Sequence, residues 1–397
     1  MTITELNFLK SAAGKSLLER YGDYDEAALF RLLLKSNKKE KILFLAAIVT
    51  LIKLRRKATE KFSRSSEMFF TTLGLEQSTG EKIARYISSR FRTYWKVVDL
   101  SSGIGGNLIF LAEHCRQVTA VDKNETNLTC AQYNCEVYGV GEKIKFINGE
   151  AQKNINSDAD AFFLDPARDR EGKSKTRSIL NSQPPLLEIL SQIFLVTRNV
   201  GVKISPAFDY QELELLPDKP EVEIISEDNT NKVAMLWFGD LKIAARRATI
   251  LSGDSLYSYN DQEQNNPDFS STPLAYLYEP NKAIIKAHLI DELAVEYGLA
   301  KINSQLSLLT GDRIVGSDRP GLWRIFKVLV CEPFSWAKLQ NFLQNRQIER
   351  INILTKRFPL KPEELYKKLK IKEGGNLFLI LTVLSDEKRY YVLAEKA

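Results

Sequence analysis

The sequence predicts an α/β protein built on a doubly wound, mostly parallel sheet, with a helical N-terminal domain and a small α/β C-terminal domain. Residues 1–90 carry apolar residues at three- and four-residue spacing, which is typical of amphipathic helices. From about residue 95 to 250, short β-rich runs alternate with amphipathic segments, the pattern of a parallel sheet with helices on both faces. Strand and helix patterns alternate again after residue 275.

The chain of 397 residues is too long for one compact core, so we expect several domains. Its 44% apolar and 27% charged residues are ordinary for a globular protein, and its net charge of +6 confines any nucleic-acid surface to a local patch. Four cysteines lack a C-x-x-C pair, and two histidines cannot complete a metal site with them. We therefore expect buried reduced thiols, no metal and a cytoplasmic protein.

The domain boundaries follow from these patterns. We expect a helical domain over 1–90, a central domain over 91–251, a polar linker over 252–275 and a C-terminal domain over 276–397. The longest apolar stretch, ILFLAAIVTLI, is far shorter than the roughly 20 residues that span a bilayer, so we interpret it as a buried helix and expect no membrane association.

The central domain is expected to contain five strand segments and a closing hairpin. The segments are WKVVDL, QVTAVD, IKFING, DAFFLDP and NVGVKISP, and the hairpin joins VEIISED to KVAMLWFG through NTN.

The first strand of this domain ends at Asp99 and leads into the loop SSGIGG. Glycines at 103, 105 and 106 permit positive φ and a close approach of the backbone to a ligand. The N–H groups that begin the next helix can hold a polar or anionic group. The dinucleotide fingerprint needs glycine or alanine where Leu108 stands, so the loop alone fits either a cofactor site or a simple turn.

The second strand ends at Asp122, 23 residues after Asp99. A carboxylate at this strand tip can accept both hydroxyls of a ribose, as in adenosine-containing cofactors. The structural alternative is that Asp122 caps the following helix.

The fourth strand ends in Asp165, Pro166, Ala167 and Arg168. The Asp165 carboxylate and the Pro166 carbonyl can accept the N–H groups of a weakly nucleophilic amine and orient it for an in-line methyl transfer. The alternative is a turn with Arg168 in a surface ion pair.

These motifs resemble those of class I S-adenosylmethionine-dependent methyltransferases, whose fold is Rossmann-like. DLSSGIGG is similar to their cofactor loop, AVDK to the acidic ribose position, GEAQ to the adenine segment and LDPAR to the catalytic turn. The resemblance implies S-adenosylmethionine as the cofactor and 91–251 as the catalytic domain. It places Asp99, Ser101, Gly103 and Gly105 around the methionine part, Asp122 and Lys123 at the ribose, Glu150 and Ala151 at the adenine, and residues 165–168 at the substrate.

The chain is similar to one bacterial subgroup of these enzymes, a branch related to the trimethylguanosine synthases with a THUMP-like C-terminal domain. The similarity extends through LGLEQSTGEKIARYI, VKISPAFD and the C-terminal segments. It implies that Gln77, Ser78 and Thr79 line the cofactor pocket, although Ser78 and Glu81 also predict a capping box. Lys203 is expected either to point at the substrate or simply to end a strand.

Two departures affect this assignment. Ala167 and Arg168 replace the second proline and the aromatic residue of the usual N-methylating turn, so base stacking must come from elsewhere. DPAR also occurs in 5-methyluridine RNA methyltransferases, but the next strand here, VGVKISP, lacks their nucleophilic cysteine.

The resulting hypothesis is a methyltransferase that acts on a base nitrogen of RNA. Two basic stretches, Arg346 to Lys372 and residues 53–64, are the candidate RNA surfaces. The alternatives are methylation of a protein or small molecule, or an inactive RNA-binding protein. Leu108 and LDPAR disfavour an NAD oxidoreductase.

Overall fold

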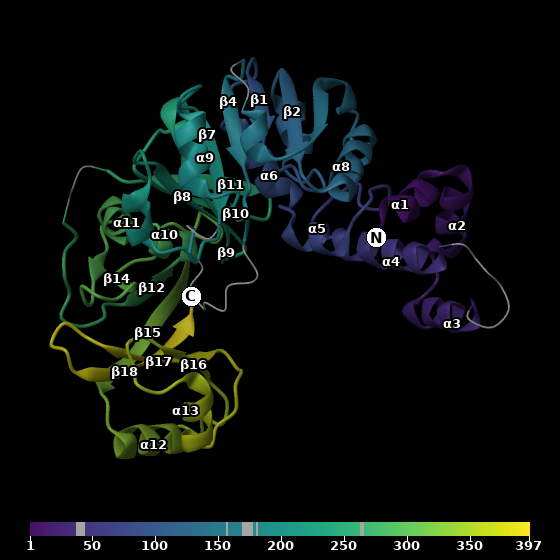
Figure 1. The fold of residues 1–397 in the computed structure, drawn as a ribbon. Helices are drawn as coiled ribbons and strands as arrows, with labels where there is room; N and C mark the ends of the chain where they lie inside the picture. Colours follow the sequence, from purple (N-terminus) through teal and green to yellow (C-terminus); the bar gives the residue numbers. More distant parts are fainter. Residues whose placement is uncertain (37–43, 156–157, 169–177, 180–181, 263–265) are drawn as a thin grey trace. The chain divides into compact units, whose positions relative to one another are not determined.

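The computed structural model describes residues 1–36, 44–155, 158–168, 178–179, 182–262 and 266–397 (Figure 1). The chain divides into two compact units. The first comprises residues 1–220 and 235–243, and the second comprises residues 221–234 and 244–397.

The first unit begins with helices, as the sequence predicts. Thr2 opens the first of them with a capping box to Glu5. The apolar stretch near residue 50 forms α4, whose buried residues include Ile48 and Leu51. No helix in the described part of the chain has both the length and the apolar character needed to cross a membrane. The helices are α1 (Ile3–Lys10), α2 (Ala12–Gly22), α3 (Glu26–Ser36), α4 (Leu45–Ala58), α5 (Thr72–Gln77) and α6 (Glu81–Ser89).

The predicted capping box of Ser78 and Glu81 is wrong. Gly80 is the N-cap of α6, and the Ser78 hydroxyl instead donates to the Leu75 carbonyl at 2.8 Å. The Glu81 carboxylate accepts the backbone N–H of Ser63 at 2.9 Å. Contacts between segments therefore replace the local cap.

The sheet of the first unit is parallel, which confirms the predicted fold class. Its strand order is β7-β4-β1-β2-β3, with parallel pairing throughout, and the last residues of β9 lie beside β7. The strands lie within two residues of the segments that the sequence predicts. They are β1 (Lys96–Asp99), β2 (Gln117–Asp122), β3 (Ile144–Asn148), β4 (Ala161–Leu164), β7 (Val200–Ile204) and β9 (Thr230–Trp237).

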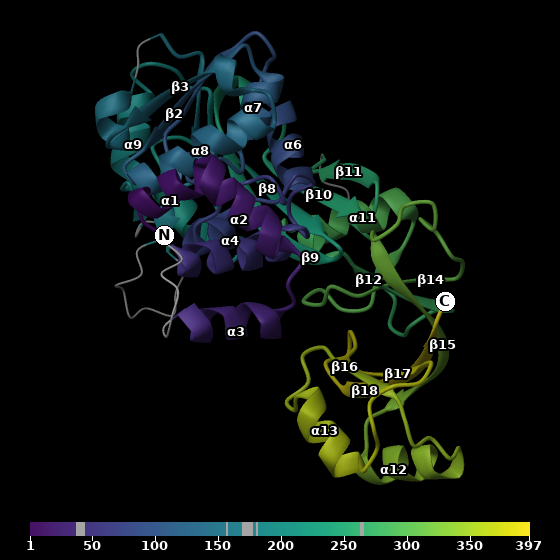
Figure 2. The same cartoon turned by 90° about the vertical axis from the view of Figure 1, so that its right-hand side faces the viewer.

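Helices cover both faces of this sheet. The chain moves in one direction from β1 through α7 to β2 and in the opposite direction from β4 through α9 to β7. Because parallel crossovers share one hand, the two helices lie on opposite faces (Figure 2). The remaining elements of this unit are α7 (Leu108–His114), α8 (Glu125–Val137), α9 (Leu186–Ile193), β5 (Ala167–Arg168), β6 (Ser182–Gln183), η1 (Gly141–Lys143), η2 (Ala151–Asn154), η3 (Tyr210–Leu215) and η4 (Gly239–Leu241).

The second unit begins with strands in the order β11-β10-β8 and the first residues of β9 beside β8. Strands β8 (Glu221–Glu227) and β9 are joined by Asp228 and Asn229, both with positive φ, as in a tight hairpin turn. The segment expected as a linker contains β11 (Ser255–Asn260), which pairs antiparallel with β10 (Arg246–Ser252). Gly253, at φ +56°, makes the two-residue turn between them.

The second unit continues with a seven-stranded sheet in the order β13-β14-β12-β15-β18-β17-β16. Leu339, Leu343 and Leu365 from helices α12 and α13 pack into its core. The sequence pattern suggests one helix over 281–299, but His288, at φ +57°, separates α10 from α11, and its carbonyl accepts from Arg246 at 2.6 Å. The elements are β12 (Tyr276–Pro280), α10 (Lys282–Lys286), α11 (Ile290–Tyr297), β13 (Ala300–Lys301), β14 (Leu309–Gly311), β15 (Trp323–Pro333), α12 (Trp336–Asn345), β16 (Asn352–Thr355), α13 (Pro362–Leu369), β17 (Leu377–Val383) and β18 (Arg389–Lys396).

Candidate functional site

The candidate site lies at the carboxyl ends of β1, β2 and β4. Strand β1 pairs with both β2 and β4, and the connections from this point run to opposite sides of the sheet. Such a reversal leaves a crevice at the strand ends, where ligands of α/β proteins bind. The predicted glycine loop follows β1, and the predicted catalytic turn follows the neighbouring β4.

The glycine loop needs glycine at two of its positions. Gly103 and Gly105 have φ of +54° and +95°, a region that other residues rarely adopt. A Cβ on Gly105 would lie 3.3 Å from the Cα of Ala131 on α8, whereas one on Gly103 would meet no atom within 4 Å. The loop is thus packed tightly against α8 at Gly105 and is open at Gly103. Leu108 begins α7 and is fully buried, so it serves the core.

Asp122 supports this loop through both of its carboxylate oxygens. Oδ2 accepts the backbone N–H of Gly103 at 2.8 Å, and Oδ1 accepts that of Asn124 at 2.8 Å. Burial raises the pKa of Asp122, and these two N–H donors oppose that rise. The helix α8 is capped by Asn124, which accepts from Asn127 at 3.0 Å, so Asp122 is not its N-cap.

Asp99 is 1% exposed and lies beneath the loop. Its pKa is raised to about 8, first by burial and also by the nearby carboxylates of Asp165 and Asp122, while the Ser101 N–H and Lys203 act in the opposite direction. The Ser101 N–H donates to Oδ1 of Asp99 at 3.1 Å. The structure therefore gathers three carboxylates at the ends of three neighbouring strands.

The segment 77–79 packs against the same loop. The Thr79 hydroxyl accepts from Nδ2 of Asn107 at 3.1 Å, and a Cβ on Gly106 would lie 3.2 Å from that of Ser78. Lys61 stabilises the segment, since its ammonium donates to the carbonyls of Leu75 and Ser78, both at 2.8 Å. Thr79 is buried, but the side chain of Gln77 is exposed.

The predicted adenine and ribose positions lie beside Asp122. The Gly149 N–H donates to the Asp122 carbonyl at 3.1 Å, which brings Glu150 and the buried Ala151 to the end of β2. The Glu150 carboxylate is exposed and pairs with Lys153 at 2.7 Å. Lys123, the next residue after Asp122, donates from its ammonium to the side chain of Gln183 of β6 at 3.3 Å.

Asp165 is tied both to the glycine loop and to β7. Its backbone N–H donates to the Ser101 hydroxyl at 2.6 Å, and its carboxylate forms an ion pair with the Lys203 ammonium. Pro166 is half-buried. The backbone of Ala167 and Arg168 forms β5, which pairs with β6, but their side chains lie outside the described part of the structure.

Sequence reasoning missed three features of the site. It did not predict the ion pair between Lys203 and Asp165, although a lysine within the apolar strand VGVKI indicates that a partner for its charge is needed. It missed Lys61, whose role is visible only in three dimensions. It also missed Asn107, whose buried Oδ1 has no hydrogen-bond partner among the described residues.

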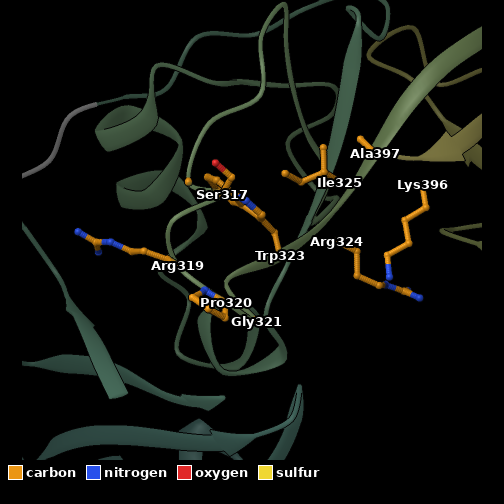
Figure 3. Close-up of a pocket in the computed structure, with 10 residues that line it drawn as sticks. Ser317, Arg319, Pro320, Gly321, Trp323, Arg324, Ile325, Lys396 and Ala397 are labelled. Atoms are coloured by element: carbon orange, nitrogen blue, oxygen red, sulfur yellow. The ribbon is translucent and has the colours of Figure 1, made fainter. Parts of the chain in front are cut away.

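A separate cavity of about 240 Å³ lies in the second unit (Figure 3). It is lined by Arg319, Trp323, Arg324 and Lys396 and contains none of the predicted site residues. In the described ranges, no group of three or more His, Cys, Asp or Glu side chains is arranged to hold a metal ion.

Sequence profiles of three families match different parts of the chain. Residues 95–184 match the RNA cap guanine-N2 methyltransferases, 276–316 match a ferredoxin-like domain, and 323–396 match the THUMP domain-like family. The first match covers β1 to β6, and therefore the glycine loop, Asp122 and Asp165.

Individual proteins are similar over larger parts of the chain. An uncharacterized S-adenosylmethionine-dependent methyltransferase of Mycobacterium tuberculosis is 27% identical over 351 residues, which cover 86% of this chain and 93% of the relative. The 23S rRNA (uracil(747)-C(5))-methyltransferase of Pyrococcus horikoshii is 28% identical over 134 residues, 33% of this chain and 32% of that protein. A crystal structure described as a methyltransferase from Porphyromonas gingivalis W83 covers 96% of this chain and 97% of its own, with a TM-score of 0.80 and 23% identity.

Proposed function

We propose that this chain, a class I S-adenosylmethionine-dependent methyltransferase with a THUMP-like C-terminal domain, methylates a base nitrogen in RNA. The observation that carries the proposal is the place of Asp165. Its partly exposed carboxylate lies at the end of β4, and its backbone N–H donates a hydrogen bond to the Ser101 hydroxyl of the glycine loop.

The residues at the strand ends fit the cofactor. S-adenosylmethionine supplies an electrophilic methyl group on a sulfonium, and it carries a net positive charge. The pKa of Asp99 is raised first by burial and also by the carboxylates of Asp165 and Asp122, and a cation bound beside these groups would favour their charged forms. The space at Gly103 accommodates the methionine part, and the unpartnered Oδ1 of Asn107 can accept a hydrogen bond.

Asp122 would hold the ribose. Each of its carboxylate oxygens accepts one backbone N–H, which leaves further lone pairs for hydroxyl donors. Ala151, next to the end of β3, would border the adenine, with Glu150 at the rim. Thr79 and the exposed Gln77 would border the opposite side of the loop.

Asp165 and Pro166 would act on the acceptor. An exocyclic amine of a base has a delocalised lone pair and is a weak nucleophile. A carboxylate oxygen and the Pro166 carbonyl can each accept one of its N–H groups and so fix the nitrogen in line with the methyl group. The proton that the nitrogen loses on methylation passes to the Asp165 carboxylate and from there to solvent.

The cysteines disfavour methylation of carbon through a covalent intermediate, which needs a thiolate nucleophile. Burial raises the pKa of Cys115 and of Cys130 to about 12, that of Cys331 to about 11, and that of Cys135 as well. At neutral pH these thiols are protonated and unreactive.

RNA is supported as the substrate by the descriptions of the matching families and by the basic surface of the C-terminal domain. Lys367 and Lys370 are exposed, lie three residues apart at the end of α13, and have no ion pair among the described residues. Lys368, between them, has its ammonium 5.0 Å from the ring centre of Trp336. Two exposed cations at a helix end suit contacts with phosphates.

The basic side chains of the N-terminal stretch, residues 53–64, are less available for contacts with RNA phosphates. Arg55 donates to the Met68 carbonyl at 2.9 Å, Arg56 to the Gly22 carbonyl at 2.7 Å, and Lys61 to the end of α5. These side chains hold the helices together. We therefore assign RNA binding to the C-terminal stretch.

The direct test is transfer of a radiolabelled methyl group from S-adenosylmethionine to total RNA by the purified protein. The proposal predicts label in RNA that is recovered in N-methylated nucleosides. Label in protein or in small molecules instead, with none in RNA, would refute the substrate assignment. Label on base carbon would refute the assignment of the nitrogen.

A further inference from the structure

We infer that Lys203 is a positioning residue for methyl transfer: it holds one oxygen of Asp165 and leaves the other to face the acceptor nitrogen. This inference rests on the proposed role of Asp165. Nothing in the family matches assigns a role to Lys203.

The sheet register brings the two side chains together. Strands β4 and β7 pair in parallel with Leu164 opposite Val202, so the next residues, Asp165 and Lys203, lie side by side at the carboxyl end. The Lys203 ammonium donates to Oδ2 of Asp165. Since the neighbouring strand residues fix both backbones, the pair has little freedom to rearrange.

Burial distinguishes this pair from ordinary surface ion pairs. The side chain of Lys203 is 13% exposed and that of Asp165 is 27% exposed. Lys96 and Asp158 form the contrasting pair at the amino end of β1, with side chains 37% and 72% exposed. An ion pair exposed to water contributes little to the free energy of folding. Two charges that are shielded from water attract each other more strongly.

The pair has two chemical consequences. The ion pair joins the ammonium to a carboxylate, which only accepts hydrogen bonds and therefore selects N–H or O–H donors. It also occupies Oδ2, so Oδ1 and the Pro166 carbonyl remain as the two acceptors for an amine. Lys203 therefore orients the acceptor through Asp165, without contacting it.

The test compares Lys203→Met, Lys203→Arg and the matched control Lys96→Met in the full-length protein. We expect Lys203→Met to lower kcat by about tenfold or more at pH 6.5 while the Kd for S-adenosylmethionine changes by less than about threefold. Lys203→Arg should restore most of the rate, and Lys96→Met should behave as wild type.

A Lys203→Met variant with the wild-type kcat would overturn the inference. So would a kcat loss that arginine does not restore and that comes with an equal weakening of S-adenosylmethionine binding, since a purely structural role would give that result.

A second measurement does not depend on the acceptor. Asp165→Asn, Lys203→Met and the double variant form a cycle in which urea denaturation midpoints are compared. We expect the midpoint shifts to be non-additive, and additive shifts would overturn the ion pair. Failure of the wild-type protein to label RNA would refute the proposed function instead, and this cycle would still decide the pair.

Discussion

Gly103 donates its backbone N–H to Oδ2 of Asp122 at 2.8 Å, and this bond joins the loop after β1 to the end of β2. The carboxylate thus does two things: it fixes the conformation of the glycine loop, and it stands at the position expected for the ribose. A glycine loop alone is compatible with a turn. The bond to Asp122 makes the two motifs parts of one site.

The first prediction concerns Asp122. Replacement by alanine should weaken S-adenosylmethionine binding by about 10- to 100-fold, because two backbone N–H groups lose their acceptor and the ribose hydroxyls lose theirs. Calorimetric titration measures the change. Asp240→Ala is the matched control, since that carboxylate is exposed, is paired with Arg92 and lies outside the site, and it should alter Kd by less than about threefold. Equal effects of the two substitutions would contradict the assignment.

The second prediction concerns Gly105. Gly105→Ala should lower the free energy of unfolding by about 1–3 kcal/mol, because alanine is strained at φ +95° and its Cβ would lie 3.3 Å from the Cα of Ala131. Cofactor binding should weaken with it. Gly22→Ala is the control, as a Cβ there meets nothing within 4 Å. Urea denaturation of the two variants gives the comparison, and an unchanged midpoint for Gly105→Ala would show that the loop tolerates other conformations.

The third prediction concerns the pH dependence of stability. Burial raises the pKa of Asp99 to about 8 from its ordinary value of 3.8. Between these two values the folded protein keeps a proton that the unfolded chain releases, so Asp99 makes the free energy of unfolding fall as pH rises from about 4 to about 8. In Asp99→Asn this contribution disappears. Thermal unfolding of the cofactor-free protein at pH 5 and pH 8 should show a smaller difference for the variant, and an identical difference would contradict the burial of a protonated Asp99.

The fourth prediction separates the two basic stretches. Lys367→Glu combined with Lys370→Glu should reduce RNA affinity by about tenfold. The slope of log affinity against log salt should fall by about 0.7 for each single-strand phosphate that a lysine no longer neutralises. Lys53→Glu combined with Lys57→Glu, at exposed positions on α4, is the control of equal charge change. A larger effect of the α4 variant, measured by filter binding at two salt concentrations, would move the RNA surface to the N-terminal domain.

The strands of the catalytic core could be predicted because the residue pattern that specifies each of them lies within the strand itself. Each is a short run with apolar β-branched or aromatic residues, and the polar residues Asp99, Asp122 and Asp165 mark where the chain leaves the sheet. The carboxyl ends of neighbouring parallel strands meet at one edge of the sheet, and the order of the strands came from the resemblance to a known fold, so these three carboxylates could be expected together.

The missed features depend on interactions between distant residues. The Ser78 capping box failed because Ser63 and Lys61, far back in the chain, engage Glu81 and the end of α5. The helix break at His288 is stabilised by Arg246, and β11 arises from a two-residue turn at Gly253 inside a polar segment. The lysine in the apolar strand VGVKI draws attention to Lys203, but its pairing with Asp165 follows from the register of β4 and β7.

The most direct test of the central claim is a comparison of the modified nucleosides in RNA from cells with and without this protein. Deletion cells are complemented with either the wild-type chain or Asp165→Ala, which should still bind S-adenosylmethionine. The account predicts that one N-methylated nucleoside is lost on deletion, restored by the wild-type chain and not restored by Asp165→Ala. Identical nucleoside profiles in all four strains, or full restoration by Asp165→Ala, would contradict it.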